Sequence, residues 1–219
     1  MRRLALTCLT VALQLPPPPA PGQSPPDPLA LVEAAGRVYR EAAGICADFR
    51  QVLSVPLLGE DRKGRGRLCT QQPDRFAMRF TEPAGDLVVA DGEWLWLYTP
   101  STDARQVLRF PLAAGPRGVD FYREFLEAPR EKYRSAYRGR ETVDGTLTHH
   151  VVLTPLQAAP YRTAELWITA EEALLCQIVI REQNGSVRTV TLSAIEVSPG
   201  LGADVFRFTP PTGAQVITL

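Results

Sequence analysis

Apolar and polar residues follow their clearest pattern between positions 73 and 98. In residues 75–81, Phe76, Met78 and Phe80 alternate with Arg75, Ala77 and Arg79, which is the period-2 pattern of a half-buried strand. This run therefore predicts a strand with one apolar face.

Two further short runs follow, at residues 86–90 and 94–99, separated by Asp91-Gly92. That dipeptide is typical of tight hairpin turns, because glycine tolerates the positive φ that such turns need. The second run, W-L-W-L-Y-T, is apolar on both faces. Either other parts of the protein cover both faces, or one face lines a binding site for an apolar ligand.

The segment Pro28–Gly44 has its apolar residues at helical spacing, Leu31 and Val38 among them, after Asp27 as a potential N-cap. It predicts an amphipathic helix that packs on a sheet. A second, shorter helix is predicted at 119–128, with Phe121 and Phe125 among its apolar residues.

The remaining pattern predicts an antiparallel meander, with further tight turns at Asp144-Gly145 and Asn184-Gly185. We expect a mainly β (α+β) fold with about eleven strands and two interposed helices. Besides the three runs above, strands are expected at residues 46–54, 64–71, 105–110, 133–143, 146–154, 164–169, 174–182, 186–195 and 206–209.

The N-terminus differs from the rest of the chain. Two arginines, a twelve-residue apolar run and Ala20-Pro21-Gly22 are typical of a cleaved export signal at residues 1–22. A Pro-rich tether at 23–28 and a single domain at 29–219 would follow. Cleavage leaves 22 basic and 24 acidic residues, a balance that gives no electrostatic footprint for nucleic acid. We expect an exported, soluble, monomeric periplasmic protein.

Three cysteines remain after the leader. If residues 55–59 connect the first two strands, positions that sum to about 115 face each other, and Cys46 and Cys69 do so. A cross-strand disulfide is then geometrically allowed, and an exported protein permits it. Two buried thiols are the alternative. Cys176 lies in an apolar run and is expected in the core.

Catalytic motifs are absent from the sequence. It holds no G-x-S-x-G, P-loop or H-E-x-x-H pattern, and Gly64-Arg65-Gly66-Arg67 lacks the third glycine of a dinucleotide site. His149 and His150 are adjacent, so on a strand they point to opposite faces and do not share a metal. One exposed and one half-buried histidine are expected. We therefore expect no enzyme activity, no cofactor and no metal.

The apolar and aromatic residues remain as candidates for function. From pattern alone, a plain hydrophobic core under two helices is the simpler interpretation. Two features favour a cavity instead: methionine adapts to varied ligands, and two helices are a small cover for a long sheet.

Four segments in register give the chain a family resemblance. They read D-F-R-Q at 48–51, P-D-R-F-A-M-R-F-T-E-P at 73–83, L-V-V-A-D-G-E-W-L-W-L-Y-T-P at 87–100 and F-R-F-T-P-P at 206–211. In this order they resemble the LolA-like outer-membrane lipoprotein carriers, and the match runs across most of residues 29–217.

The resemblance implies an incomplete antiparallel β-barrel whose concave apolar face is covered by a helical lid and sequesters acyl chains. The lid residues would be Leu31, Val38, Phe121 and Phe125. The residues expected to line the lipid-binding cavity are Phe49, Phe76, Met78, Phe80, Trp96 and Tyr98. The implied partners are acylated lipoproteins, an inner-membrane ABC exporter and an outer-membrane receptor.

One departure from the family concerns the lid. Well-known members carry a basic residue before the proline that opens the segment 73–83, whereas this chain has Gln72 before Pro73. Gln72 would be the lid latch, without a charge-assisted bond. An envelope-stress sensor of the same fold, or a phospholipid- or glycolipid-binding protein, remains an alternative to the carrier.

Overall fold

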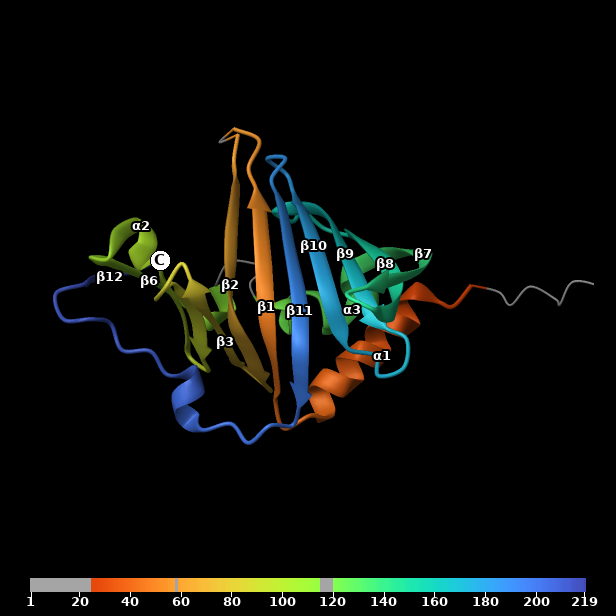
Figure 1. Cartoon of the computed structure of the whole chain (residues 1–219), viewed down its shortest axis with the longest axis horizontal. Coiled ribbons are helices and arrows are strands. Elements are labelled where there is room, and N and C mark those ends of the chain that lie inside the picture. The colour runs from red at the N-terminus through yellow and green to blue at the C-terminus, as the bar shows by residue number, and fades with distance from the viewer. Residues whose placement is uncertain (1–24, 58, 115–119) are drawn as a thin grey trace, which may run out of the picture.

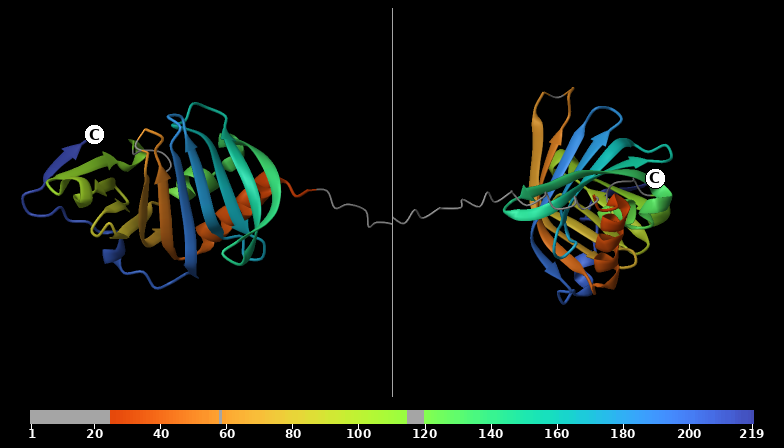
Figure 2. Two further views of the ribbon diagram at one scale, coloured as in Figure 1. Left: turned by 45° about the horizontal axis from the view of Figure 1, so that its top comes forward. Right: turned by 90° about the vertical axis from the view of Figure 1, so that its right-hand side faces the viewer.

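A single open sheet of twelve strands dominates the structure, a computed structural model that describes residues 25–57, 59–114 and 120–219. The sheet curves around its helices without closing (Figures 1 and 2), so the predicted mainly β, incomplete barrel is confirmed. From edge to edge, the strands are β12 (Gln215–Thr218), β6 (Gln106–Pro111), β5 (Trp94–Tyr98), β4 (Leu87–Asp91), β3 (Arg75–Glu82), β2 (Asp61–Gln71), β1 (Ile45–Ser54), β11 (Val187–Val197), β10 (Leu175–Glu182), β9 (Tyr161–Thr169), β8 (Thr146–Pro155) and β7 (Tyr133–Val143).

The predicted hairpins are confirmed. β4 and β5 join through Asp91-Gly92, where the Asp91 carboxylate accepts the N–H groups of Glu93 and Trp94 at 2.9 and 2.8 Å. β7–β8 and β10–β11 join through the other two predicted turns. All neighbouring strands in the described sheet are antiparallel except β12 and β6, which are parallel.

Helix α1 (Pro28–Glu41) lies on the concave face of the sheet (Figure 2). Its N-cap is Asp27, whose side chain accepts the Leu29 N–H at 3.0 Å. The helix ends at Glu41, three residues before the predicted end. Gly44 serves a close approach instead, because a Cβ there would lie 2.4 Å from the Leu201 side chain.

A π-helix, η2 (Tyr122–Leu126), packs against α1, and α3 (Pro129–Lys132) follows it. The second helix predicted at 119–128 is therefore shorter than expected, because its helical part is η2 and α3 begins beyond its predicted end, after Ala128 at a φ of 46°. Residue 119 lies outside the described residues. Gly36 of α1 allows the close contact, since a Cβ there would lie 2.6 Å from the Leu126 carbonyl oxygen. Short helices α2 (Pro100–Asp103), η1 (Leu112–Ala114) and η3 (Ala203–Phe206) complete the described elements.

The main core lies between these helices and the concave face, where α1 contacts β7, β8 and β9. Arg130 of α3 fixes the start of α1. Its guanidinium binds the carboxylates of Asp27 at 2.6 Å and Glu33 at 2.8 Å. Helices thus fill one half of the curved sheet.

The outer face of β3–β5 carries the C-terminal segment after β11. Phe206 packs there against the cysteine pair, and Arg79 donates to the carbonyls of Val205 and Arg207 at 3.2 and 2.7 Å. The strand predicted at 206–209 is wrong: these residues form the end of η3 and an irregular crossing. The last strand is β12, which the sequence pattern missed.

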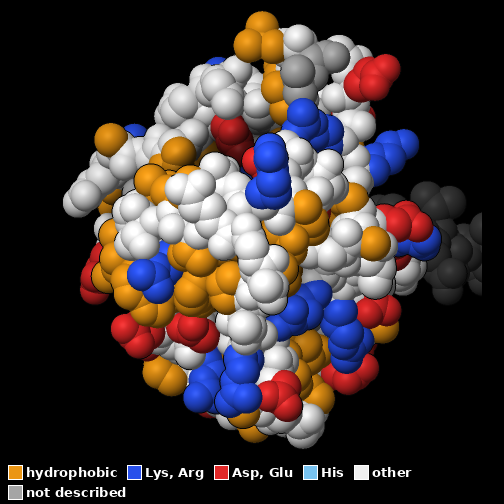
Figure 3. Space-filling view, turned by 90° about the vertical axis from the view of Figure 1, so that its left-hand side faces the viewer, with side chains coloured by type: hydrophobic (Ala, Val, Ile, Leu, Met, Phe, Trp, Pro, Cys, Tyr) orange, Lys and Arg blue, Asp and Glu red, His pale blue; other side chains and the backbone are white. Residues whose placement is uncertain are grey.

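No helix in the described part of the chain is long and apolar enough to cross a membrane. Seen from the end that carries β6 and β12, basic and acidic side chains are interspersed, with hydrophobic ones between them (Figure 3). This mixture agrees with the near balance of charge in the sequence.

Candidate ligand-binding cavity

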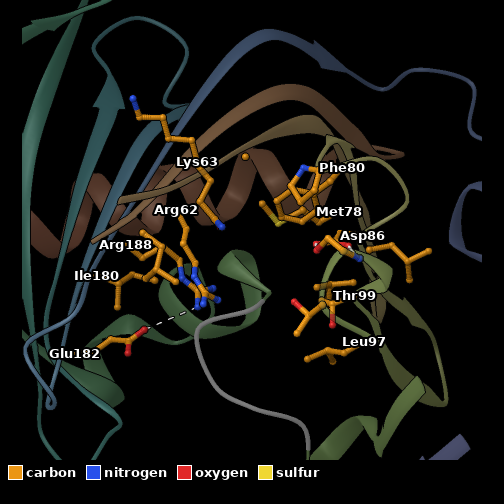
Figure 4. A pocket seen from close by; sticks show the side chains of 18 of the residues that line it. Arg62, Lys63, Met78, Phe80, Asp86, Leu97, Thr99, Ile180, Glu182 and Arg188 are labelled. Atoms are coloured by element: carbon orange, nitrogen blue, oxygen red, sulfur yellow. Dashed lines mark hydrogen bonds and ion pairs between the residues drawn. The ribbon is translucent and has the colours of Figure 1, made fainter. Parts of the chain in front are cut away.

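A cavity of about 470 Å³ opens on the concave face beside the half that the helices fill. Its walls come from β1–β5 and β9–β11, and Phe121 borders it from the lid side. Figure 4 shows side chains that line it. The apolar lining includes Leu53, Met78, Phe80, Val88, Leu97 and Ile180. Such a volume lies within the range of about 300–1,000 Å³ that is usual for a site that binds one small ligand.

Two glycines of β2 allow β3 to approach closely, Gly64 beside the Phe80 ring and Gly66 beside the backbone of Arg79 and Phe80. A Cβ at Gly64 would lie 2.7 Å from Cε1 of Phe80, and one at Gly66 would lie 1.9 Å from the Arg79 carbonyl oxygen. Phe80 also meets Phe49 edge-on, with ring centroids 4.9 Å apart. The glycine-rich start of β2 therefore shapes the cavity wall, a role that its sequence did not reveal.

The other side of the cavity is polar and basic. Arg62 and Lys63 of β2 and Arg188 of β11 line it, together with Glu182 of β10. Burial lowers the pKa of Arg188, whose side chain is 30% exposed. On the apolar side, Asp86 is fixed by Ser101, which donates its N–H at 3.1 Å and its hydroxyl at 2.7 Å.

The lid is attached to the sheet through a buried polar cluster. Glu124 of η2, 8% exposed, accepts a hydrogen bond from the Tyr161 phenol. The Tyr133 phenol lies 2.7 Å from the Glu124 carbonyl oxygen and 2.8 Å from the Tyr161 phenol. Burial above all, and then hydrogen bonding to Glu124, raises the pKa of Tyr161. Tyr161 therefore stays neutral, and the hydrogen bonds of the two phenols hold η2 against the sheet.

The predicted lid residues lie against this core. Phe121 and Phe125 are 5% and 0% exposed, and Phe121 meets Phe76 edge-on at 6.3 Å. Leu31 and Val38 of α1 are partly buried against the same cluster.

The contacts between the lid region and the segment around Pro73 come from Gln71 and Asp74, on either side of Gln72-Pro73. Gln71 donates its side-chain N–H to the Ala43 carbonyl, just after α1, at 3.1 Å. Arg123 of η2 approaches Asp74 at 4.0 Å. Gln72 itself precedes a cis peptide bond to Pro73 and is half-buried. Its predicted latch role stays a prediction, while Gln71 makes the observed bond.

A match to a family model shows which protein family the chain belongs to. The model described as outer membrane lipoprotein carrier protein LolA matches residues 40–209. The chain belongs to this family.

Curated relatives support the assignment. The chain is 27% identical over 171 residues to an outer-membrane lipoprotein carrier protein of Legionella pneumophila (strain Lens), covering 78% of this chain and 81% of the relative. It is 28% identical over 170 residues to the carrier protein of Proteus mirabilis (strain HI4320), covering 78% and 79%.

Solved structures support the fold. An uncharacterized conserved protein from Thermus thermophilus has a TM-score of 0.56 at 15% identity, covering 87% of this chain and 99% of that one. A chain of the MucA/MucB complex of Pseudomonas aeruginosa has a TM-score of 0.52 at 15% identity, covering 89% and 64%.

Four of the six predicted cavity residues of this LolA-family chain lie on the concave face. Met78 and Phe80 line the cavity. Phe49 and Phe76, each 1% exposed, pack in the core on the same side.

The placement predicted for Trp96 and Tyr98 is wrong. Both lie on the outer face, where their rings pack on Phe208 at 5.9 and 5.6 Å between centroids. Trp96 also donates its indole N–H to Asp91 at 2.7 Å. Leu95 and Leu97 of the same strand face inward instead, since successive residues alternate faces.

The disulfide between Cys46 and Cys69 is present, with an S–S distance of 2.04 Å. Residues of β1 and β2 pair with positions that sum to 115, as predicted. The bond lies on the outer face, beside Ala77 and Phe206. Cys176 is a buried free thiol, as expected.

The two histidines point to opposite faces, but both are 8% exposed, so the expectation of one exposed histidine is wrong. His149 contacts the Tyr137 phenol at 2.9 Å, and burial lowers its pKa. His150 stacks on Trp167 and meets Glu141 and Glu165 at 2.9 and 3.0 Å. In the described residues no group of three His, Cys, Asp or Glu is placed to hold a metal ion.

Proposed function

We propose that this protein is a periplasmic carrier of acylated lipoproteins. It takes them from an inner-membrane ABC exporter and passes them to an outer-membrane receptor. Residues 1–22 serve as its export signal and 23–28 as a tether to the domain at 29–219. It acts by binding and not by catalysis.

The observation that carries this proposal is the cavity with an apolar side that opens next to the helices on the concave face, in a chain of the lipoprotein carrier family. Met78 and Phe80 offer apolar surface to an acyl chain, and each buried CH₂ contributes about 0.8 kcal/mol. Affinity therefore needs no covalent chemistry.

The size of the cavity implies lid movement. At about 470 Å³ it suits one small ligand, whereas a lipoprotein with several acyl chains needs more room. Helices α1 and η2 fill the rest of the concave face, so their displacement would enlarge the site during loading. Their return would accompany delivery.

The test is release of a triacylated lipoprotein from spheroplasts into a complex with the purified protein. The wild type should release it, and Met78→Glu should not, because a carboxylate would stand in the acyl site. Leu147→Glu is the control, since Leu147 is 46% exposed on β8. Release by Met78→Glu as efficient as by the wild type would contradict the cavity assignment.

A sensor of the same fold is the second candidate. The similarity to a chain of the MucA/MucB complex supports it at the level of fold. A carrier should pass its bound lipoprotein on to outer membranes, whereas a sensor should keep it. Mass spectrometry of the natively purified protein adds a second criterion: acylated lipoproteins favour the carrier, and free phospholipid or glycolipid favours a lipid-binding protein.

A further inference from the structure

Two arginines reach the cavity from strands on either side of β1. Leu53 pairs with Arg62 of β2 and with Arg188 of β11, and Arg188 pairs with Ile180 of β10. Residues directly opposite in a sheet share a face. Figure 4 shows the side chains of Arg62 and Arg188 converging at the polar side of the cavity.

The two guanidinium groups at this side of the cavity have few acidic partners. Glu182 is the carboxylate that faces Arg188, and its Oε1 lies 3.8 Å from the Arg188 Nη2. The Arg188 Nε is buried, and no acceptor among the described residues lies within hydrogen-bond distance of it. Buried donors normally find an acceptor, so an acceptor from outside the chain is expected here.

The surroundings define what kind of acceptor fits. A guanidinium binds the oxygens of carboxylates and phosphates through parallel N–H donors. Leu53 and Ile180 stand in the same row as the arginines, and Phe80 and Met78 continue the lining away from it. A ligand with an anionic head and an apolar tail would satisfy both parts.

We infer that Arg62 and Arg188 bind the anionic head of an acyl lipid, a carboxylate or a phosphate, whose chain occupies the cavity. This inference rests on the proposed acyl-binding function and adds a ligand class to it. Anionic single lipids, as well as lipoproteins, are then cargo or competitors.

The test compares ligands of equal chain length by isothermal titration calorimetry: dodecanoate and dodecyl phosphate below their micelle-forming concentrations, and dodecanol below its solubility limit. The wild type should bind the two anions about tenfold or more tightly than dodecanol, the scale of a charge-assisted hydrogen bond. Arg188→Met and Arg62→Met should lose that preference and keep the affinity for dodecanol. Arg50→Met is the control, because Arg50 lies on β1 with its side chain 63% exposed and paired with Asp144.

Each other outcome has a defined meaning. Equal wild-type affinity for dodecanoate and dodecanol would overturn the headgroup site and leave the acyl cavity standing. Binding of none of the three ligands would remove the proposed function itself. Inorganic phosphate that displaced dodecyl phosphate at equal concentration would indicate a free-anion site and overturn the lipid inference. Arg62 is exposed, so its replacement should not impair folding. If Arg62→Met still bound the two anions more tightly than dodecanol, the headgroup inference would also be overturned.

Discussion

The Tyr161 phenol donates a hydrogen bond to the buried carboxylate of Glu124. This contact joins strand β9 to the π-helix of the lid, and Tyr133 of β7 closes the cluster. π-Helical turns recur at functional sites. The position of the lid therefore depends on a polar contact as well as on apolar packing.

Glu124→Gln should loosen the lid, because an amide gives the two phenols a weaker acceptor than a carboxylate does. We expect the free energy of unfolding to fall by about 1–3 kcal/mol. Backbone hydrogen exchange in residues 122–126 should become faster. Glu127→Gln is the matched control, since Glu127 is exposed. Unchanged exchange in η2 would show that packing alone holds the lid.

Gly64→Ala should push the Phe80 ring into the cavity, because the new Cβ would lie 2.7 Å from it. We expect weaker binding of dodecanol by calorimetry and a loss of stability of about 1–3 kcal/mol from overpacking. Gly200→Ala should change neither quantity, since a Cβ there meets no heavy atom within 4 Å. Dodecanol affinity equal to that of the wild type would mean that Phe80 does not border the ligand.

Replacement of both Cys46 and Cys69 by alanine should separate stability from binding. Loss of the bond that closes this hairpin should cost about 3 kcal/mol, as measured by urea unfolding. The affinity for dodecanol should stay at the wild-type value, because the disulfide lies on the outer face. Chemical reduction of the wild type should have the same effect. A parallel loss of affinity would show that the disulfide also sets the cavity walls.

Asp120, just before η2, should make stability depend on pH. Burial raises its pKa from 3.8 to about 6, although the N–H groups of Tyr122 and Arg123 bind its carboxylate at 3.0 and 3.2 Å. Between these values the folded state binds more protons than the unfolded state, so stability falls as pH rises through this window.

Asp120→Asn should flatten that dependence, because asparagine still caps the turn but does not titrate. The difference in unfolding free energy between wild type and variant should change by on the order of 2 kcal/mol between pH 4 and 7. Urea unfolding at several pH values measures it. A difference that stays constant across this range would contradict the raised pKa.

Local chemistry made much of this fold predictable. The alternation of Phe76, Met78 and Phe80 indicated their common face, and the turn dipeptides located three hairpins. The register of β1 and β2 followed from their connection, which placed Cys46 opposite Cys69. In each case the residues belong to one strand or to one hairpin, so the local pattern was sufficient.

Long-range packing limited the rest. Trp96 and Tyr98 lie in a strand that is apolar on both faces, so alternation alone did not say which face turns inward; Phe208, far away in sequence, decides it. The short β12 pairs in parallel with the distant β6. Arg188 stands on the same face of β11 as the buried Val190 and Leu192, but nothing in its sequence indicates that this end of the row borders a cavity; its strand neighbours reveal it.

The C-terminal segment also determines which part of the molecule can give way. After β11 it crosses the outer face to β12 and is secured by Phe206 beside the disulfide, by Arg79 and by the edge-on contact of Phe208 with Trp96. The sheet could flatten only if all of these contacts with the C-terminal segment were broken. The curvature is therefore fixed from outside, and any expansion for bulky cargo has to take place on the lid side alone.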